Sequence, residues 1–130
     1  DRSVSRGLGD VYKRQVLYVD SASCSGCFLN RLVGYHDINA SLAAHDGELL
    51  VVLHPQKERQ EEIKRRMRYE RYPFWCIVDV SGEFRENNPG IPENPLLHTF
   101  SLNEQGDVIL VGDPTRNDRI KELFHREVLK

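Results

Sequence analysis

Apolar residues gather in short runs that alternate with longer polar segments along the chain. Three of these runs, at residues 16–20, 48–54 and 74–80, predict strands, and the first two are typical of strands buried on both faces of a sheet. Two more runs, at 98–102 and 107–111, are separated by the turn sequence NEQG and favour an antiparallel hairpin. The sequence therefore predicts five strands.

Helical spacing of apolar residues marks three of the remaining segments, at residues 24–44, 56–71 and 117–129. Gly34 and residues 37–39 mark points at which the first of these is expected either to kink or to split in two. Residues 81–97 are polar and contain three prolines, so no helix is expected there. Strands that alternate with helices require crossover connections, which predicts parallel pairing of the first three strands. The predicted fold class is α/β, with a central mixed sheet of about five strands flanked by helices.

The first fifteen residues have no hydrophobic period, and they resemble translated sequencing-adapter read-through. We therefore expect residues 1–15 to be a disordered, non-native leader. The remaining residues, 16–130, are enough for one domain with its own hydrophobic core.

Composition and charge exclude several classes of partner. The chain of 130 residues is 39% hydrophobic and 29% charged, and its net charge of −2 gives no reason to expect nucleic acid or an anionic membrane as partner. No apolar stretch approaches the roughly 20 residues of a membrane span. The sequence does not specify the oligomeric state.

The strongest chemical signal is Cys24-Ser25-Gly26-Cys27, directly after the first predicted strand and at the start of a helical segment. Unpaired N–H groups at a helix start stabilise a thiolate and lower its pKa, so this placement is typical of a redox-active dithiol. A static disulfide and a metal site are the alternatives, although a zinc site needs four ligands and there is no second C-x-x-C pair. Cys76, in the middle of a predicted strand, is interpreted as a buried thiol.

The order of elements and the C-x-x-C pair resemble the thioredoxin fold. More narrowly, the chain is similar to extracytoplasmic thiol–disulfide oxidoreductases of the TlpA type, including short lipoprotein members from Bacteroides-like bacteria. The stretches that carry the resemblance, within residues 16–130, are VLYVDSASCSGCFLN, ELLVVLHP, RYPFWCIVDVSGEF and HTFSLNEQGDVILVG. The resemblance implies disulfide exchange with protein thiols and disulfides, no cofactor or metal, and a location in the bacterial periplasm or cell envelope.

The resemblance also assigns roles to the two cysteines. Cys24 matches the exposed nucleophile, and Cys27 matches the buried cysteine that resolves the mixed disulfide. The Ser25-Gly26 pair contains no histidine of the kind that stabilises the thiolate in strongly oxidising relatives, which favours a reductant over an oxidant.

Three positions depart from the family pattern. Ser23 stands where the family usually has tryptophan, Tyr18 where many members have a buried acid, and Leu97 where the family has a cis-proline. The proline loop of the family faces the cysteines and contacts the bound peptide, and the nearest proline in this chain is Pro95. The resemblance therefore implies that Ser23, Pro95 and Leu97 are the substrate contacts. These departures leave a second hypothesis, a catalytically weak binding or scaffold module whose disulfide is structural.

Overall fold

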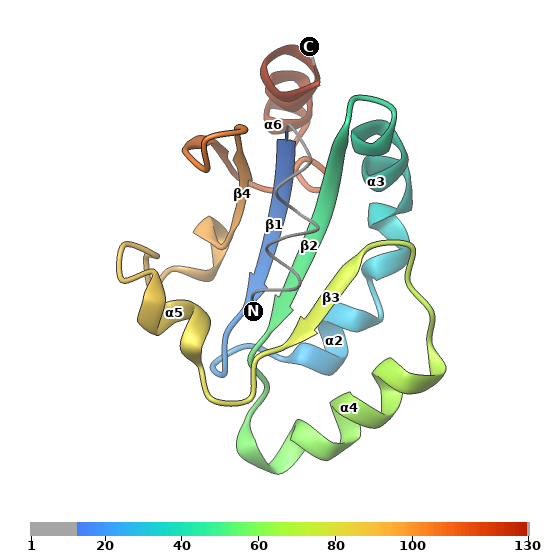
Figure 1. Ribbon diagram of the computed structural model, residues 1–130, viewed down its shortest axis with the longest axis vertical. Helices are drawn as coiled ribbons and strands as arrows, with labels where there is room; N and C mark the ends of the chain where they lie inside the picture. The colour runs from blue at the N-terminus through green and yellow to red at the C-terminus, as the bar shows by residue number, and fades with distance from the viewer. Residues whose placement is uncertain (1–12, 130) are drawn as a thin grey trace.

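The computed structural model describes residues 13–129, which form a mixed sheet with helices on both faces (Figure 1). The strands are β1 (Lys13–Val19), β2 (Gly47–Leu53), β3 (Trp75–Val78), β4 (Thr99–Leu102) and β5 (Val108–Val111). The α-helices are α2 (Ser25–Leu29), α3 (His36–Ala43), α4 (Gln60–Tyr69), α5 (Glu83–Asn87) and α6 (Asp118–Leu123). Three 3₁₀ turns, η1 (Leu32–Tyr35), η2 (Lys57–Arg59) and η3 (Pro95–Leu97), join them, and the π-helix η4 (Phe124–Val128) extends α6.

The five strands lie in the order β3-β2-β1-β4-β5. β1, β2 and β3 pair in parallel, while β4 is antiparallel to both β1 and β5. Figure 1 shows β1 between β2 and β4, at the centre of the sheet. The predicted mixed sheet of five strands is thus confirmed.

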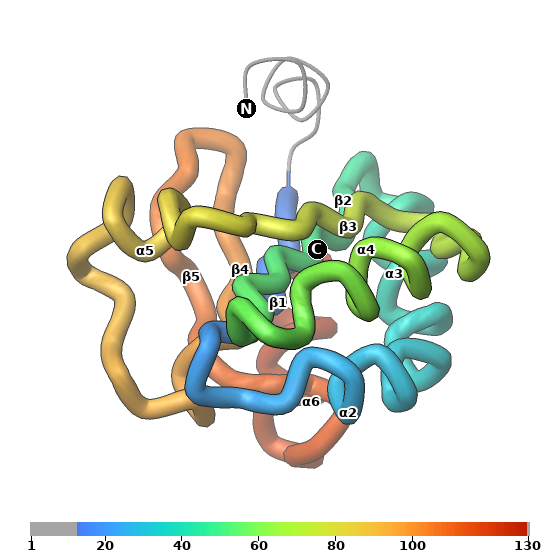
Figure 2. The backbone as a smooth tube through the Cα atoms, turned by 90° about the horizontal axis from the view of Figure 1, so that it is seen from below, coloured from blue at the N-terminus to red at the C-terminus, as the bar shows by residue number. Residues whose placement is uncertain are grey.

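The two faces of the sheet bury unequal cores, because successive strand residues point to opposite faces. The larger core packs β1 and β2 against α2, η1, α3, Ile63 of α4, and η4; its best buried residues include Leu17, Leu32, Leu42, Leu49 and Phe124. The smaller core consists of Val16, Tyr18, Leu50 and Val52, packed against partly buried residues such as Phe84 of α5. Figure 2 shows α5 on the opposite side of the molecule from α2, α3 and α6.

The first strand begins at Lys13, three residues before the predicted start at residue 16. Gln15 is buried, and its side-chain oxygen accepts a hydrogen bond from the Ser101 hydroxyl of β4. This bond satisfies the side-chain oxygen of Gln15 but not its Nε2, and an apolar pattern cannot reveal such a buried polar residue. The predicted boundary between leader and domain at residue 15 therefore falls inside β1, and residues 1–12 of the expected leader lie outside the described residues.

The prediction that residues 81–97 contain no helix is wrong, because α5 lies within them. The Asp79 carboxylate accepts hydrogen bonds from the N–H groups of Glu83 at 3.0 Å and Phe84 at 2.9 Å, which satisfies two donors at the start of this helix. Gly82, with φ of 77°, supplies the left-handed turn that precedes it. The prolines begin only after the helix has ended.

The predicted helix at residues 24–44 is divided into α2, η1 and α3. In the part of the chain that the structure describes, no helix combines the length and the hydrophobicity needed to cross a bilayer.

Candidate functional site

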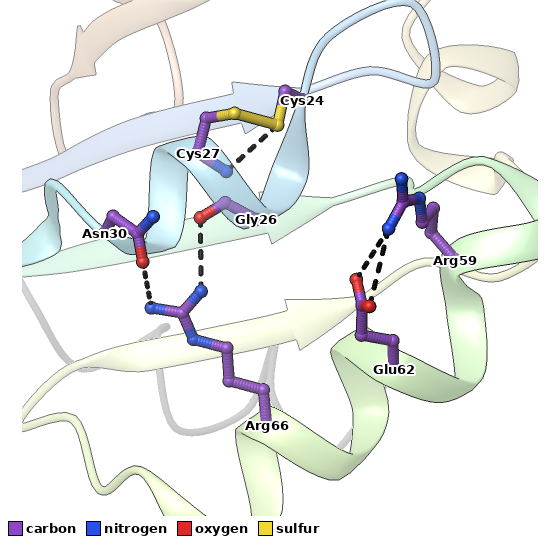
Figure 3. Close-up of a disulfide and its surroundings, with 7 residues drawn as sticks. All are labelled: Cys24, Gly26, Cys27, Asn30, Arg59, Glu62 and Arg66. Carbon is purple, nitrogen blue, oxygen red and sulfur yellow. Dashed lines mark hydrogen bonds and ion pairs between the residues drawn. A yellow bond between two sulfur atoms is a disulfide. The ribbon is translucent and has the colours of Figure 1, made fainter.

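Cys24 and Cys27 form a disulfide where the loop after β1 enters α2, with their Cα atoms 5.2 Å apart (Figure 3). Cys24 is the N-cap residue of α2, and its Sγ atom accepts a hydrogen bond of 3.1 Å from the N–H of Cys27. A backbone N–H directed at this sulfur favours negative charge on it. In the reduced protein, the same N–H would therefore stabilise a thiolate at Cys24.

Both cysteines of the pair are exposed to solvent, which corrects the prediction that Cys27 is buried. Ser25, Phe28 and Leu29 form the buried face of α2. At about 100° per residue, Cys27 lies on the opposite face of this helix. The side chains that anchor α2 in the core thus turn Cys27 outward.

Arg66 of α4 binds the backbone between the two cysteines. Its Nη1 donates to the carbonyl oxygen of Gly26 at 3.2 Å, and its Nη2 donates to Oδ1 of Asn30 at 2.7 Å (Figure 3). Its Nε donates to Glu70 at 2.8 Å. The hydroxyl of Tyr72 and this guanidinium lower the pKa of Glu70. One side chain of α4 therefore holds both ends of the α2 segment.

The turn between β1 and Cys24 is organised by Asp20. Its Oδ1 accepts hydrogen bonds from the N–H of Ala22 at 3.1 Å and the hydroxyl of Ser23 at 3.2 Å. Its Oδ2 lies 3.4 Å from Nη2 of Arg85 and 4.0 Å from Nδ1 of the buried His98. The carboxylate of Asp20 is thus directed at the turn and at Arg85.

Tyr18, which stands where the TlpA-type pattern has an acid, is buried in the smaller core against Phe84 and His98. Burial raises the pKa of Tyr18, although the Arg85 guanidinium, 5.6 Å from the ring centroid, acts in the opposite direction. The phenol is therefore neutral near pH 7 and is not a base for a cysteine thiol.

Two cavities open beside the disulfide, and Ser23, Cys24 and Cys27 line both. The first cavity, of about 340 Å³, lies toward η3 and is also lined by Pro95 and Leu96. The second, of about 490 Å³, lies toward η2 and α4. The structure thus places Ser23 and Pro95 in one cavity with the cysteines, and their role as substrate contacts stays a prediction.

Leu97 does not join them, which corrects its expected position at the disulfide. It lines a separate apolar cavity together with Phe84 and Phe100. Successive side chains of a 3₁₀ turn point about 120° apart, so Leu96 faces the disulfide cavity and Leu97 turns away from it. His98, not Leu97, directly precedes β4, and its carbonyl accepts the N–H of Tyr18 at 3.0 Å.

Comparison with known proteins defines the fold. No family model matches the chain, and no curated protein does. Two solved structures match over most of their length: the pneumococcal exposed lipoprotein thioredoxin of Streptococcus pneumoniae strain TIGR4, and the N-terminal domain of PilB from N. meningitidis in its reduced form. The first has a TM-score of 0.57 and 22% identity, and the match covers 91% of this chain and 89% of the other. The second has a TM-score of 0.61 and 16% identity, and the match covers 98% and 88%. The fold is thioredoxin-like.

In this thioredoxin-like domain, residues that the sequence analysis did not single out also surround the disulfide. Tyr35 of η1 lies in the first cavity, and its buried hydroxyl donates a hydrogen bond to Asp113. Burial, reinforced by this carboxylate, raises the pKa of Tyr35. Arg66 and Tyr35 escaped prediction because their partners are distant in sequence, so no local pattern signals them.

Cys76 of the thioredoxin-like sheet is partly buried, and its Sγ lies 3.9 Å from Sδ of Met67. Burial raises the pKa of Cys76 to about 12, so its thiol is protonated at neutral pH. Within residues 13–129, no three histidine, cysteine or acidic side chains are grouped as a metal site would require.

Proposed function

We propose that this protein is a thiol–disulfide oxidoreductase that exchanges disulfides with partner proteins through Cys24 and Cys27. The observation that carries the proposal is the solvent-exposed disulfide at the start of α2, with the N–H of Cys27 directed at the sulfur of Cys24. The thioredoxin-like fold supports it.

The order of the two reaction steps follows from the positions of Cys24 and Cys27 in α2. In the reduced protein, the Cys24 thiolate attacks one sulfur of a partner disulfide, which breaks that S–S bond and releases the other partner sulfur as a thiolate. Cys27 then loses its proton and attacks Cys24, which releases the second partner sulfur and forms the Cys24–Cys27 disulfide. Two electrons pass to the partner, whose two sulfurs take up protons as thiols.

The partner contacts, the redox direction and the location that we propose rest on residue types and on similarity to the family. We assign Ser23 and Pro95 to contacts with the partner chain, because both line the cavity beside Cys24. The Ser25-Gly26 pair lacks a histidine, which supports a reductant. TlpA-type kinship and a location in the periplasm or cell envelope are in keeping with one solved relative being an exposed lipoprotein thioredoxin.

One observation favours a second candidate, a scaffold module with a structural disulfide. Leu97, in the loop where the family presents its partner-binding proline, faces away from the disulfide. If the disulfide is only structural, it will not cycle with a protein substrate.

Thiol titration and partner trapping test the proposal. We expect dithiothreitol to expose two additional reactive thiols, and the reduced protein to reduce a model protein disulfide. Cys24→Ser should abolish this activity, whereas Cys27→Ser should accumulate a mixed disulfide with the substrate through Cys24. A disulfide that resists dithiothreitol, or a Cys24→Ser variant with full activity, contradicts the proposal.

A further inference from the structure

We propose that the partner segment that reaches Cys24 carries acidic side chains beside its own cysteine. This inference rests on the proposed function and specifies the substrate of the same site. Arginines line the cavities on both sides of the disulfide: Arg31 and Arg116 line the first, and Arg59 and Arg66 line the second. We call these four residues the arginine rim.

Two members of the arginine rim are already engaged. Arg59 pairs with Glu62 at 3.3 Å, and Arg66 pairs with Glu70 at 2.8 Å while it binds α2 (Figure 3). Because these charges are compensated within α4 and its flanking residues, they contribute little net attraction for a partner.

Arg31 and Arg116 are different, because neither has an ion pair with any residue between 13 and 129. Both are exposed. The guanidinium of Arg31 lies 6.0 Å from the centroid of the Phe28 ring, which places it against the helix that carries the cysteines. Asp113, the acid of the first cavity, is occupied by hydrogen bonds from Tyr35 and Thr115. Asp113 still counts as one negative charge, so Arg31 and Arg116 leave the first cavity with a formal net charge of +1.

The charge of the site opposes that of the chain. Counted with Glu70, the partner of Arg66, the arginine rim faces three carboxylates, so the site has a formal net charge of +1, whereas the whole chain carries −2. A cleft of one sign concentrates ligands of the opposite sign, and this steering weakens with ionic strength. An acidic segment is thus attracted to the disulfide, although the chain as a whole carries a net negative charge.

A different role for the same arginines would be to stabilise the Cys24 thiolate. That effect would change the rate for every partner by the same factor. Selection of an acidic partner changes the ratio of rates between partners, so the ratio is the quantity to measure.

The test uses three short peptides that differ only in the residues flanking a single cysteine: glutamate, glutamine or lysine. Each is supplied as its disulfide-linked dimer, and its reduction by the dithiothreitol-reduced, desalted full chain is followed by acid quench and chromatography. We expect the glutamate peptide to react about fivefold faster than the glutamine peptide at low ionic strength, with the lysine peptide slowest. At about 0.5 M salt, where the Debye length is only a few ångströms, the ratio should approach one.

The variant Arg31→Gln/Arg116→Gln should bring the glutamate-to-glutamine ratio close to one. Arg68→Gln, which removes an exposed arginine of α4 that lines neither cavity, should keep the wild-type ratio. If the double variant does not fold, as judged by circular dichroism, Arg116→Gln alone should lower the ratio about twofold.

Equal rates for all three peptides, or a ratio that survives the double variant, would overturn the inference while leaving the proposed function intact. Failure of the reduced wild-type protein to reduce any of the peptides would instead count against the proposed function itself.

Discussion

The carbonyl of Gly26 lies between the two cysteines, and a side chain from another helix is bonded to it. Arg66 makes this bond and also holds Asn30, so α4 and α2 are fixed to each other through one guanidinium. The sequence does predict the pairing of Cys24 with Cys27, because the spacing allows it. It does not predict this support, since Arg66 belongs to a charged run that has the pattern of a solvated helix face.

We expect Arg66→Gln to lower the free energy of unfolding by about 1–2 kcal/mol, because a glutamine side chain cannot make both bonds and carries no charge. Arg66 and Glu70 are partly exposed, so solvent screening limits the contribution of their ion pair. Urea unfolding monitored by circular dichroism measures the change. Arg65→Gln, on the exposed side of α4, is the matched control and should change stability by no more than about 0.5 kcal/mol. Equal stability of the two variants would show that the bonds to α2 contribute nothing.

Cys76 provides a second prediction at the scale of single residues. Burial raises its pKa to about 12, so its thiol should be unreactive toward Ellman's reagent at pH 8 in the folded, reduced protein, while Cys24 reacts. Addition of urea should expose one further thiol. Rapid reaction of Cys76 in the folded state, seen by mass spectrometry of labelled peptides, would contradict its burial.

The raised pKa of Cys76 also makes the free energy of unfolding depend on pH. The folded-state pKa of Cys76 lies above the ordinary value of 9.0, so the unfolded chain ionises first as the pH rises. The stability contribution of the protonated thiol is complete below pH 9.0 and is lost between this value and about 12. Cys76→Ala should therefore lose less stability than the wild type between pH 8 and pH 10.5. Parallel decline of the two proteins would contradict this origin.

Elements with strong local signals could be predicted from the sequence, and elements fixed by distant contacts could not. Each of the three parallel strands contains a run of consecutive apolar residues, and the hairpin has a short polar turn, so all five strands are predicted, although β1 begins three residues earlier than expected. α5 is not predicted, because the prolines that follow it, from Pro89 onward, count against a helix in the whole segment, although Asp79 and Gly82 favour a helix start at Glu83. The solvent exposure of Cys27 could not be predicted, because it depends on which side of α2 packs against the core.

The hydrogen bond from Tyr35 to Asp113 joins η1 to the loop after β5, two elements far apart in sequence. We expect Tyr35→Phe to lower the free energy of unfolding by about 1–2 kcal/mol, since it removes a buried donor to a carboxylate. Asp113 keeps two hydrogen bonds from Thr115, at 2.8 Å and 2.6 Å, which limits the loss. Tyr69→Phe, at a tyrosine that is 81% exposed, is the matched control and should be neutral in the same urea titration. A neutral Tyr35→Phe would show that the bond does not stabilise the fold.

For the whole molecule, the disulfide depends on one of two unequal cores. Phe28 and Leu29 anchor α2 in the larger core, so the geometry of Cys24 and Cys27 is supported from that face of the sheet. The smaller core, under α5, contains only four buried apolar residues within the described chain. Packing on the larger face should therefore control both the stability and the redox site, whereas packing on the smaller face should control stability less.

Neighbouring leucines of β2 allow a direct test, because Leu49 points into the larger core and Leu50 into the smaller one. Leu49 is fully buried, whereas Leu50 retains 8% of its exposure and borders an apolar cavity of about 720 Å³. The cost of a truncated leucine grows with the cavity that it leaves, so Leu49→Ala should lower the free energy of unfolding by about 4 kcal/mol and Leu50→Ala by about 2 kcal/mol. Urea unfolding gives both values, and Ellman's titration shows whether the reduced cysteines remain equally reactive. A larger loss for Leu50→Ala would mean that the face under α5 is the principal core, and that the support of the disulfide has to be sought there.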